Sequence, residues 1–100
     1  MHAKVAIDRD RLVGLCRRWK VVELSLFGSV LREDFGPDSD VDVLVSFEPD
    51  AAWSLFDIVE LKEELRAILG REVDLVEREA IRNPFRRSRI LSTREILYAG

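Results

Sequence analysis

Two aspartates separated by one residue are the first candidates for metal-dependent chemistry in this sequence. Asp40 and Asp42 open the segment 40–47, Asp-Val-Asp-Val-Leu-Val-Ser-Phe, whose β-branched composition predicts a strand. Residues two apart on a strand point to the same side, so the two carboxylates project together while the valines face a core. Like charges this close repel unless water or a cation neutralises them. Hard oxygen ligands suit magnesium, which takes one or two carboxylates plus substrate phosphates and water.

A third aspartate repeats this pattern further along the chain. Asp74 lies between two apolar residues in the predicted strand 72–76. If this strand pairs with the first, Asp74 joins Asp40 and Asp42 on one face of a sheet. Three carboxylates arranged in this way could hold two magnesium ions roughly 4 Å apart, one beside an attacking hydroxyl and one beside the phosphates of a nucleotide.

A glycine and a serine follow another predicted strand, 21–27, and suit phosphate binding. Gly28 lets the backbone approach a phosphate closely, and the hydroxyl of Ser29 can donate a hydrogen bond. A helix beginning here would point its free N–H groups and its positive dipole end at the β and γ phosphates of a nucleotide. Arg32, one turn further on, could add positive charge.

Each of these features also has an ordinary structural explanation. The Asp-x-Asp pair would suit a solvent-facing strand after an Asp-rich turn, and Gly-Ser would suit any turn from a strand to a helix. Their combination along one short chain favours two-metal nucleotidyl transfer. The candidate catalytic and metal-ligating residues are Asp40, Asp42 and Asp74, and the candidate nucleotide-binding residues are Gly28, Ser29 and Arg32.

The elements that must hold these residues can be read from hydrophobic periodicity. Helices are predicted over 8–19 and about 53–69, with Asp50 as a cap for the second. Its apolar stripe is expected to include Phe56 and either Val59 or Glu60. A closing helical region begins at Asn83-Pro84. Its buried side is expected to consist of Phe85, Ile90, Leu91, Ile96, Leu97 and Tyr98.

The predicted order of elements is helix, strand, strand, helix, strand and helix. This order indicates the α/β fold class, with a small mixed sheet and helices packed on it. The order of the strands is left open. One hundred residues, 47% hydrophobic and 35% charged, suit a single domain spanning 1–100. A core this small makes a partner subunit a reasonable expectation.

Several classes of function are disfavoured. No apolar run has membrane-spanning length and no signal-peptide pattern opens the chain, so we expect a cytoplasmic protein with no membrane partner. Cys16 lies on the apolar stripe of the first helix and is expected to be a reduced core residue. The one histidine, His2, is next to the initiator methionine, which argues against cysteine-histidine catalysis.

The net charge of −3 conceals an uneven distribution. Acidic residues are concentrated between Glu33 and Asp50, with no basic residue among them. The last twenty residues contain one acid, Glu95, and these arginines: Arg82, Arg86, Arg87, Arg89 and Arg94. This end could meet phosphates or an acidic partner, or it could be a solvated helix face.

The motifs together resemble the polymerase-beta-like nucleotidyltransferase superfamily, whose signature is Gly-Ser, then Asp-x-Asp, then a third acid on a later strand. The resemblance extends from about Val21 to Tyr98, and the chain length is similar to that of the minimal (MNT) subgroup. Members of that subgroup are commonly encoded as antitoxins beside HEPN-domain ribonuclease toxins. One departure is that Leu31, Arg32 and Glu33 stand where family members often have a small residue and then glycine.

The resemblance implies a nucleotidyltransferase-like sheet and the transfer of AMP from Mg-ATP to a protein hydroxyl, the expected acceptor being a tyrosine of a HEPN-domain ribonuclease toxin. It also implies a hetero-oligomer of antitoxin and toxin. A non-catalytic antidote that neutralises the toxin by binding is the alternative. A small-molecule transferase would need room for an acceptor-binding domain, and a template-directed polymerase would need a basic surface for nucleic acid, so both rank lower.

Overall fold

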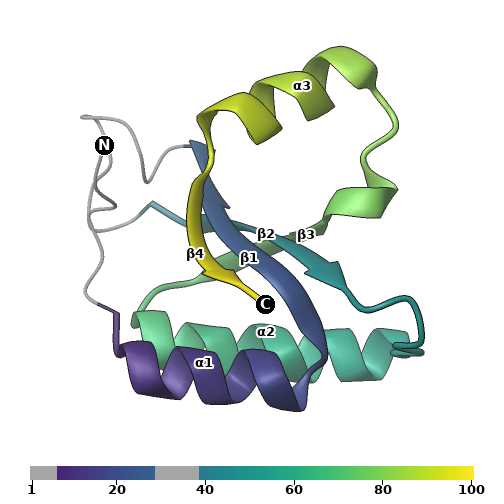
Figure 1. Cartoon of the computed structure of the whole chain (residues 1–100). Coiled ribbons are helices and arrows are strands. Elements are labelled where there is room, and N and C mark those ends of the chain that lie inside the picture. Colours follow the sequence, from purple (N-terminus) through teal and green to yellow (C-terminus); the bar gives the residue numbers. More distant parts are fainter. Residues whose placement is uncertain (1–6, 29–38) are drawn as a thin grey trace.

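The computed structural model of the chain describes residues 7–28 and 39–100, and Figure 1 shows how their elements are arranged. In chain order these are α1 (Arg9–Arg18), β1 (Val21–Phe27), β2 (Val41–Phe47), α2 (Leu55–Leu69), β3 (Val73–Glu77), the short 3-10 helix η2 (Arg78–Ala80), α3 (Pro84–Thr93) and β4 (Glu95–Ala99). No helix in these two ranges is both long and apolar enough to cross a membrane.

The strands form one mixed sheet in the order β3-β2-β1-β4. β1 pairs antiparallel with both β2 and β4, whereas β2 pairs parallel with β3. A parallel neighbour cannot be reached through a tight turn, and α2 supplies the long connection between β2 and β3. The predicted small mixed sheet with helices packed on it is confirmed, and its strand order is now defined.

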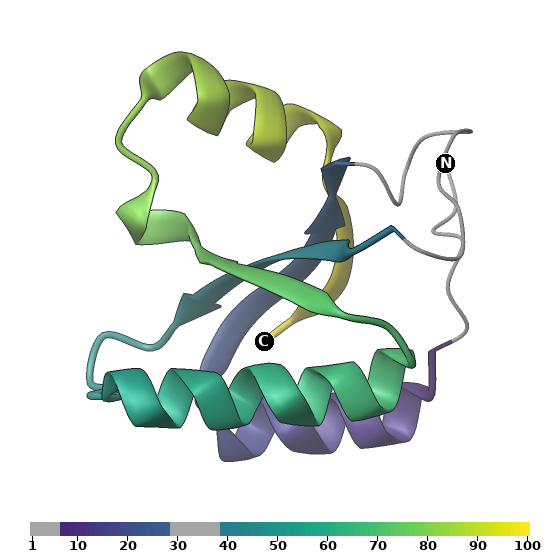
Figure 2. The same ribbon diagram turned by 180° about the vertical axis from the view of Figure 1, so that it is seen from behind.

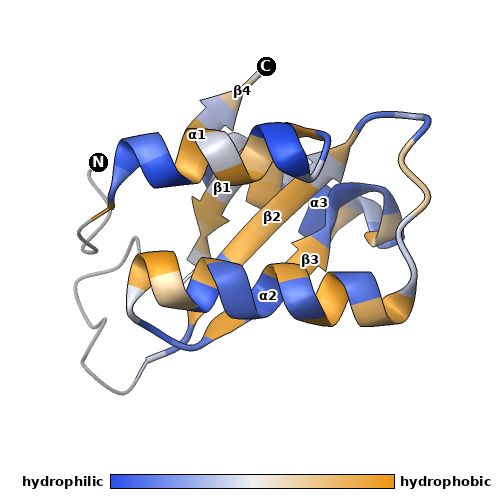
Figure 3. Ribbon diagram, turned by 90° about the horizontal axis from the view of Figure 1, so that it is seen from below, coloured by the Kyte–Doolittle hydropathy of each residue, from blue (hydrophilic) through white to orange (hydrophobic). Residues whose placement is uncertain are grey.

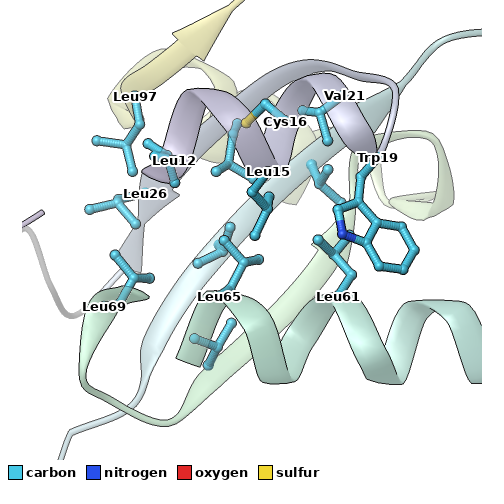
Figure 4. Packing of buried hydrophobic residues seen from close by; sticks show 14 of the residues in the cluster. Leu12, Leu15, Cys16, Trp19, Val21, Leu26, Leu61, Leu65, Leu69 and Leu97 are labelled. Atoms are coloured by element: carbon cyan, nitrogen blue, oxygen red, sulfur yellow. The ribbon is translucent and has the colours of Figure 1, made fainter. Parts of the chain in front are cut away.

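The main core lies between the sheet and one pair of helices. α1 and α2 cover one face of the sheet, and α3 lies over the other (Figure 1, Figure 2). Val41, Val43 and Val45 are completely buried beneath α1 and α2, and Figure 3 shows β2 as a hydrophobic band between these helices. Leucines of both helices meet there, Leu12 and Leu65 among them (Figure 4). Alternate residues of β2 therefore point away from this core.

A smaller apolar cluster attaches α3 to the opposite face. Phe27, Leu44 and Ile81 are buried together with Ile90, which is the one buried residue of α3. Leu91 adds a half-buried contact beside it. The helix thus rests on the sheet through a narrow stripe near its C-terminal end.

Side-chain caps fix where the helices begin. Asn83 opens α3, as predicted, and its Oδ1 accepts hydrogen bonds from two backbone N–H groups of the first turn. The prediction that Asp50 caps the second long helix is wrong. Ser54 caps it in a reciprocal arrangement with Asp57, while Asp50 forms an ion pair of 3.2 Å with Lys20.

The chain ends in a strand where the sequence predicts a helix. α3 ends at Thr93 and β4 begins at Glu95, so the expectation that Ile96, Leu97 and Tyr98 continue the helix is wrong. β4 pairs with the free edge of β1, which satisfies backbone groups on both strands. β-branched and aromatic residues such as Ile96 and Tyr98 favour strands. Local hydrophobic periodicity cannot show that a distant strand is available for pairing, so the sequence did not reveal β4.

Four aromatic or apolar residues expected on buried stripes are exposed. Phe56 is 86% exposed, Phe85 85%, Val59 54% and Ile96 48%. α2 buries the stripe formed by Leu61 and the leucines one and two turns beyond it, and Phe56 and Val59 lie off that stripe. Phe85 precedes the buried Ile90 by five residues, which places the two on different sides of α3.

An ion-pair cluster joins the C-terminal end of α3 to the sheet. The Arg94 Nε lies 2.7 Å from Oε2 of Glu23, and the Arg78 guanidinium lies 3.9 Å from the same carboxylate. The Ser25 hydroxyl donates to it at 3.1 Å. Hydrogen bonding from Arg94 lowers the pKa of Glu23; partial burial opposes this shift, and the charge of Arg94, the Ser25 hydroxyl and the charge of Arg78 reinforce it.

Truncating a leucine of the main core should destabilise the fold far more than truncating an exposed leucine of the same helix. Leu65 is fully buried in α2, and Leu65→Ala should lower the free energy of unfolding by about 2–5 kcal/mol. Leu55, 79% exposed at the start of the same helix, provides the control, and Leu55→Ala should cost less than about 0.5 kcal/mol. Urea unfolding of both variants measures the difference, and equal losses would contradict the assigned core.

The Glu23 cluster should make stability depend on pH. Because the folded pKa is lowered, its contribution is fully present above the ordinary glutamate pKa, about 4.3, and is lost as the pH falls through the folded value. Glu23→Gln should therefore melt below the parent at pH 7, with the gap closing toward pH 3. Glu63→Gln, which removes an exposed ion pair with Arg66, is the control and should show little gap at either pH.

Candidate active site

The face of the sheet beneath α3 carries the polar residues of the strands. On β2, the residues that alternate with the buried valines are Asp42, Leu44 and Ser46. Leu44 packs against Ile90 of α3, which places this row on the α3 side. The antiparallel register sets Phe27 opposite Asp42 on the neighbouring strand β1.

Asp42 and Asp74 occupy directly matched positions on neighbouring parallel strands. The register pairs Val41 with Val73, Asp42 with Asp74 and Val43 with Leu75. Matched residues on adjacent strands point to the same face, and the strands are about 4.8 Å apart. Asp42 is half-buried and Asp74 is exposed. The strand pairing on which the sequence argument depended is therefore present, and it brings these two carboxylates side by side.

Gly28 lies against the carboxylate of Asp42. It follows the end of β1 with a φ of 72°, in the left-handed region that favours glycine. A Cβ atom at this position would lie 2.2 Å from Oδ2 of Asp42. Both the backbone conformation and the space require glycine here, so the turn after β1 and the acid of β2 form one continuous site.

Asp40 precedes β2 and lies at the border of a separate hollow. The hollow has a volume of about 540 Å³ and is lined by Ser39 and Asp40 together with residues at the end of α2 and the turn that follows it. Arg71 of that turn donates to the Ser39 carbonyl at 3.4 Å, and the Val41 N–H donates to the Glu72 carbonyl at 2.9 Å. These contacts fix the start of β2 against the start of β3.

Two of the predicted site residues, Ser29 and Arg32, lie outside the described residues. Among residues 7–28 and 39–100, no group of three or more histidine, cysteine or acidic side chains is close enough to hold a metal ion. The arrangement within these ranges therefore brings together Asp42, Asp74 and Gly28, and it leaves Asp40 at the edge.

The chemistry of this donor set fits a hard divalent cation. Asp42 and Asp74 offer oxygen ligands on one face, and Asp40 stands two residues away at the strand entrance. Magnesium commonly uses one or two carboxylates and completes its coordination with water and substrate phosphates. Cys16 is the only thiol of the chain, and burial raises its pKa to about 12, so it is protonated and unreactive in the core as the sequence predicts.

Sequence reasoning missed Glu23 as part of this face. It lies in a strand of mostly apolar residues, two positions before Ser25 and four before Phe27, so all three point to the α3 side. The same argument that identified Asp74, an acid inside an apolar strand, would have found it. Its partners are Arg78, in the 3-10 helix η2 after β3, and Arg94, at the C-terminal end of α3. They could not be assigned from the sequence, because both are far from Glu23 along the chain.

A four-stranded mixed sheet with this acidic face beside a glycine turn is a nucleotidyltransferase-like α/β domain. The sequence model of the nucleotidyltransferase domain matches residues 12–97. The chain belongs to this family.

Relatives and solved structures agree with this assignment. The protein adenylyltransferase MntA of Thermococcus cleftensis is 39% identical over 84 residues, which make up 84% of this chain and 80% of that protein. A solved structure described as a candidate minimal nucleotidyltransferase superposes with a TM-score of 0.71 at 36% identity and covers 87% of this chain and 86% of its own. A complex of the tri-AMPylated Shewanella oneidensis HEPN toxin with its MNT antitoxin gives a TM-score of 0.64 at 21% identity, covering 92% and 70%, and supports the fold.

A methyl group at Gly28 should disable the site without unfolding the protein. Gly28→Ala is strained by its positive φ and would push aside the Asp42 carboxylate, so binding of magnesium-ATP should fall at least about 10-fold. Gly70→Ala is the matched control, since Gly70 has a φ of 70° and, apart from its chain neighbours, no atom of residues 7–28 and 39–100 lies within 4 Å of an added Cβ. Both variants should lose about 1–2 kcal/mol of stability, but Gly70→Ala should bind magnesium-ATP normally. Equal binding by both, measured by calorimetry, would contradict the role of the Gly28–Asp42 contact.

Proposed function

We propose that this chain is a magnesium-dependent protein adenylyltransferase that moves AMP from ATP to a hydroxyl of a partner protein. The observation that carries the proposal is the matched pair Asp42 and Asp74 on parallel strands, beside the glycine turn at Gly28. Its relationship to MntA of Thermococcus cleftensis, a protein adenylyltransferase, supports the same chemistry. We further propose that one minimal domain, residues 1–100, carries the whole activity and works in the cytoplasm.

The reaction forms one phosphoester bond and breaks one phosphoanhydride bond. The acceptor oxygen attacks the α-phosphorus of ATP, pyrophosphate leaves, and the hydroxyl proton passes to solvent. Magnesium bound by Asp40, Asp42 and Asp74 would neutralise phosphate charge and lower the pKa of the acceptor hydroxyl.

The residues of the chain would divide the remaining work between binding and orientation. Gly28 gives the phosphates close access to backbone N–H groups, and Ser29 and Arg32 are proposed to hold the phosphates through a hydroxyl and a positive charge. Asp40 and Asp42 would orient the nucleotide at the entrance of β2. Asp74, on the far strand and exposed, is proposed to serve the acceptor hydroxyl.

The proposed acceptor is a tyrosine of a HEPN-domain toxin, which makes the chain an antitoxin that forms a hetero-oligomer with its target. The MNT antitoxin in complex with an AMPylated HEPN toxin has the same fold, which supports this pairing. An antidote that acts by binding alone is the alternative, and the arginine-rich surface of α3 favours it. A triple Asp→Asn protein that binds the toxin and still suppresses it fully would favour the antidote.

Replacing Asp74 and replacing Asp42 should have different effects on ATP binding and on AMP transfer. Asp74→Asn should still bind magnesium-ATP but transfer AMP at least about 100-fold more slowly, because a tyrosine hydroxyl of pKa about 10 is mostly protonated at neutral pH. Asp42→Asn should lose both binding and transfer. Transfer of label from α-labelled ATP to the purified HEPN-domain protein, run beside ATP-binding calorimetry, measures the two quantities separately.

Asp10→Asn supplies the control for this experiment. Asp10 is an exposed acid in the first turn of α1, on the opposite side of the sheet, and its removal changes the net charge equally. Its binding and transfer should match the parent. ATP affinity that is equal in magnesium and in excess chelator would overturn the metal assignment, and an Asp74→Asn protein as fast as the parent would overturn the third carboxylate.

A further inference from the structure

The outward side of α3 is rich in basic residues. No acidic residue occurs between Glu79 and Glu95, and this stretch contains five arginines. Arg94 is paired with Glu23 on the sheet, and Arg87 is half-buried on the side of α3 that carries Ile90 and Leu91. The other three arginines, with one aromatic residue, form what we term the α3 face: Arg82, Phe85, Arg86 and Arg89.

These four residues lie together and are exposed. Phe85 and Arg89 are one helical turn apart, Arg86 and Arg89 are three residues apart, and Arg82 directly precedes the cap of the helix. Phe85 is 85% exposed. Within residues 7–28 and 39–100, none of the three arginines of the α3 face forms an ion pair, in contrast to Arg18, Arg66, Arg78 and Arg94.

α3 lies on the same side of the sheet as the candidate active site (Figure 1). Phe27 is matched with Asp42 in the sheet, and Phe27 packs in the same cluster as Ile90 of α3. α3 therefore borders the side of the sheet that carries Asp42 and Asp74. The exposed apolar residues of α2 lie on the α1 and α2 side, away from those carboxylates (Figure 1, Figure 2).

We propose that the α3 face docks an acidic surface of the protein that carries the acceptor hydroxyl. Three arginines that form no ion pair within the described ranges complement acidic side chains, and arginine and aromatic residues are the types most enriched in the centres of protein interfaces. One partner could then contact the α3 face while its hydroxyl approaches Asp74. This inference rests on the proposed function for the identity of the acceptor.

The charge distribution favours a protein over a nucleic acid as the occupant. Binding a polynucleotide requires a surface that meets phosphate after phosphate along the strand. Here the chain carries a net charge of −3, and the sheet face next to α3 contains Glu23, Asp42 and Asp74. A small basic face bordered by acidic residues is complementary to a small acidic patch on a protein.

The test uses the HEPN-domain protein from the same genome as the probe and measures its affinity for full-length variants of this chain. Arg86→Glu/Arg89→Glu should weaken binding about 100-fold at low salt, about 10-fold for each reversal, and the loss should shrink as salt is raised. Phe85→Ala should weaken binding with little dependence on salt. Arg11→Glu/Arg17→Glu changes the net charge equally on α1, on the other side of the sheet, and should leave affinity within about two-fold of the parent.

Further measurements separate this proposal from the proposed function. In AMP transfer, the double reversal should raise the KM for the HEPN-domain protein and leave both the KM for ATP and calorimetric ATP binding unchanged. If reversal weakens binding but the parent transfers no AMP, docking stands and the transferase activity fails. If the parent transfers AMP and reversal changes neither affinity nor KM, docking fails and the activity stands.

A parent that does not bind the HEPN-domain protein would overturn the docking proposal. So would a double reversal that abolishes polyuridine binding but leaves binding of the protein partner unchanged.

Discussion

The parallel pairing of β2 with β3 is the constraint on which the candidate site depends. Side chains alternate along a strand, so the same register that buries Val41 and Val73 on one face brings Asp42 beside Asp74 on the other. A slip by one residue would turn Asp74 into the main core and Val73 out of it, at the cost of an unpaired buried charge. The apolar residues of these strands thus hold the carboxylates in place, although they touch no substrate themselves. The crossover through α2 is what allows two strands with parallel direction to lie side by side.

The antiparallel pairing of β1 with β2 completes the site from the other side. It ends with Phe27 opposite Asp42, so the turn at Gly28 falls directly beside the Asp42 carboxylate. Glycine loses more conformational entropy on folding than other residues. It is nevertheless required at position 28, because φ is positive there and a Cβ atom would lie 2.2 Å from Oδ2 of Asp42. Backbone and carboxylate together create a place where an anionic nucleotide and a cation can meet.

The two faces of the sheet divide stability from function. The α1 and α2 side is almost wholly apolar and contains the large core, whereas the α3 side mixes a small apolar cluster with acids and arginines. α3 is held by Ile90 and by the pair of Arg94 with Glu23, both near its C-terminal end. Its N-terminal half and the α3 face are left for contacts outside the chain. The α3 face and the carboxylates therefore lie on the same side of the sheet, and a protein partner large enough to reach both would meet recognition and chemistry on that side.

The sequence by itself determined the elements whose signals are local. The alternation of Val41, Asp42 and Val43 identified β2 and the direction of its acids, and the Asn83-Pro84 signature located the start of α3, because side-chain period and helix capping act over a few residues. The resemblance to nucleotidyltransferases came from the same short motifs. What only the tertiary structure decided involves residues far apart in the chain: the match of Asp42 with Asp74, the contact of Gly28 with Asp42, and the pairing of Glu23 with Arg94. The final segment, 95–99, became a strand for the same reason, since the open edge of β1 offered hydrogen bonds that no local pattern encodes.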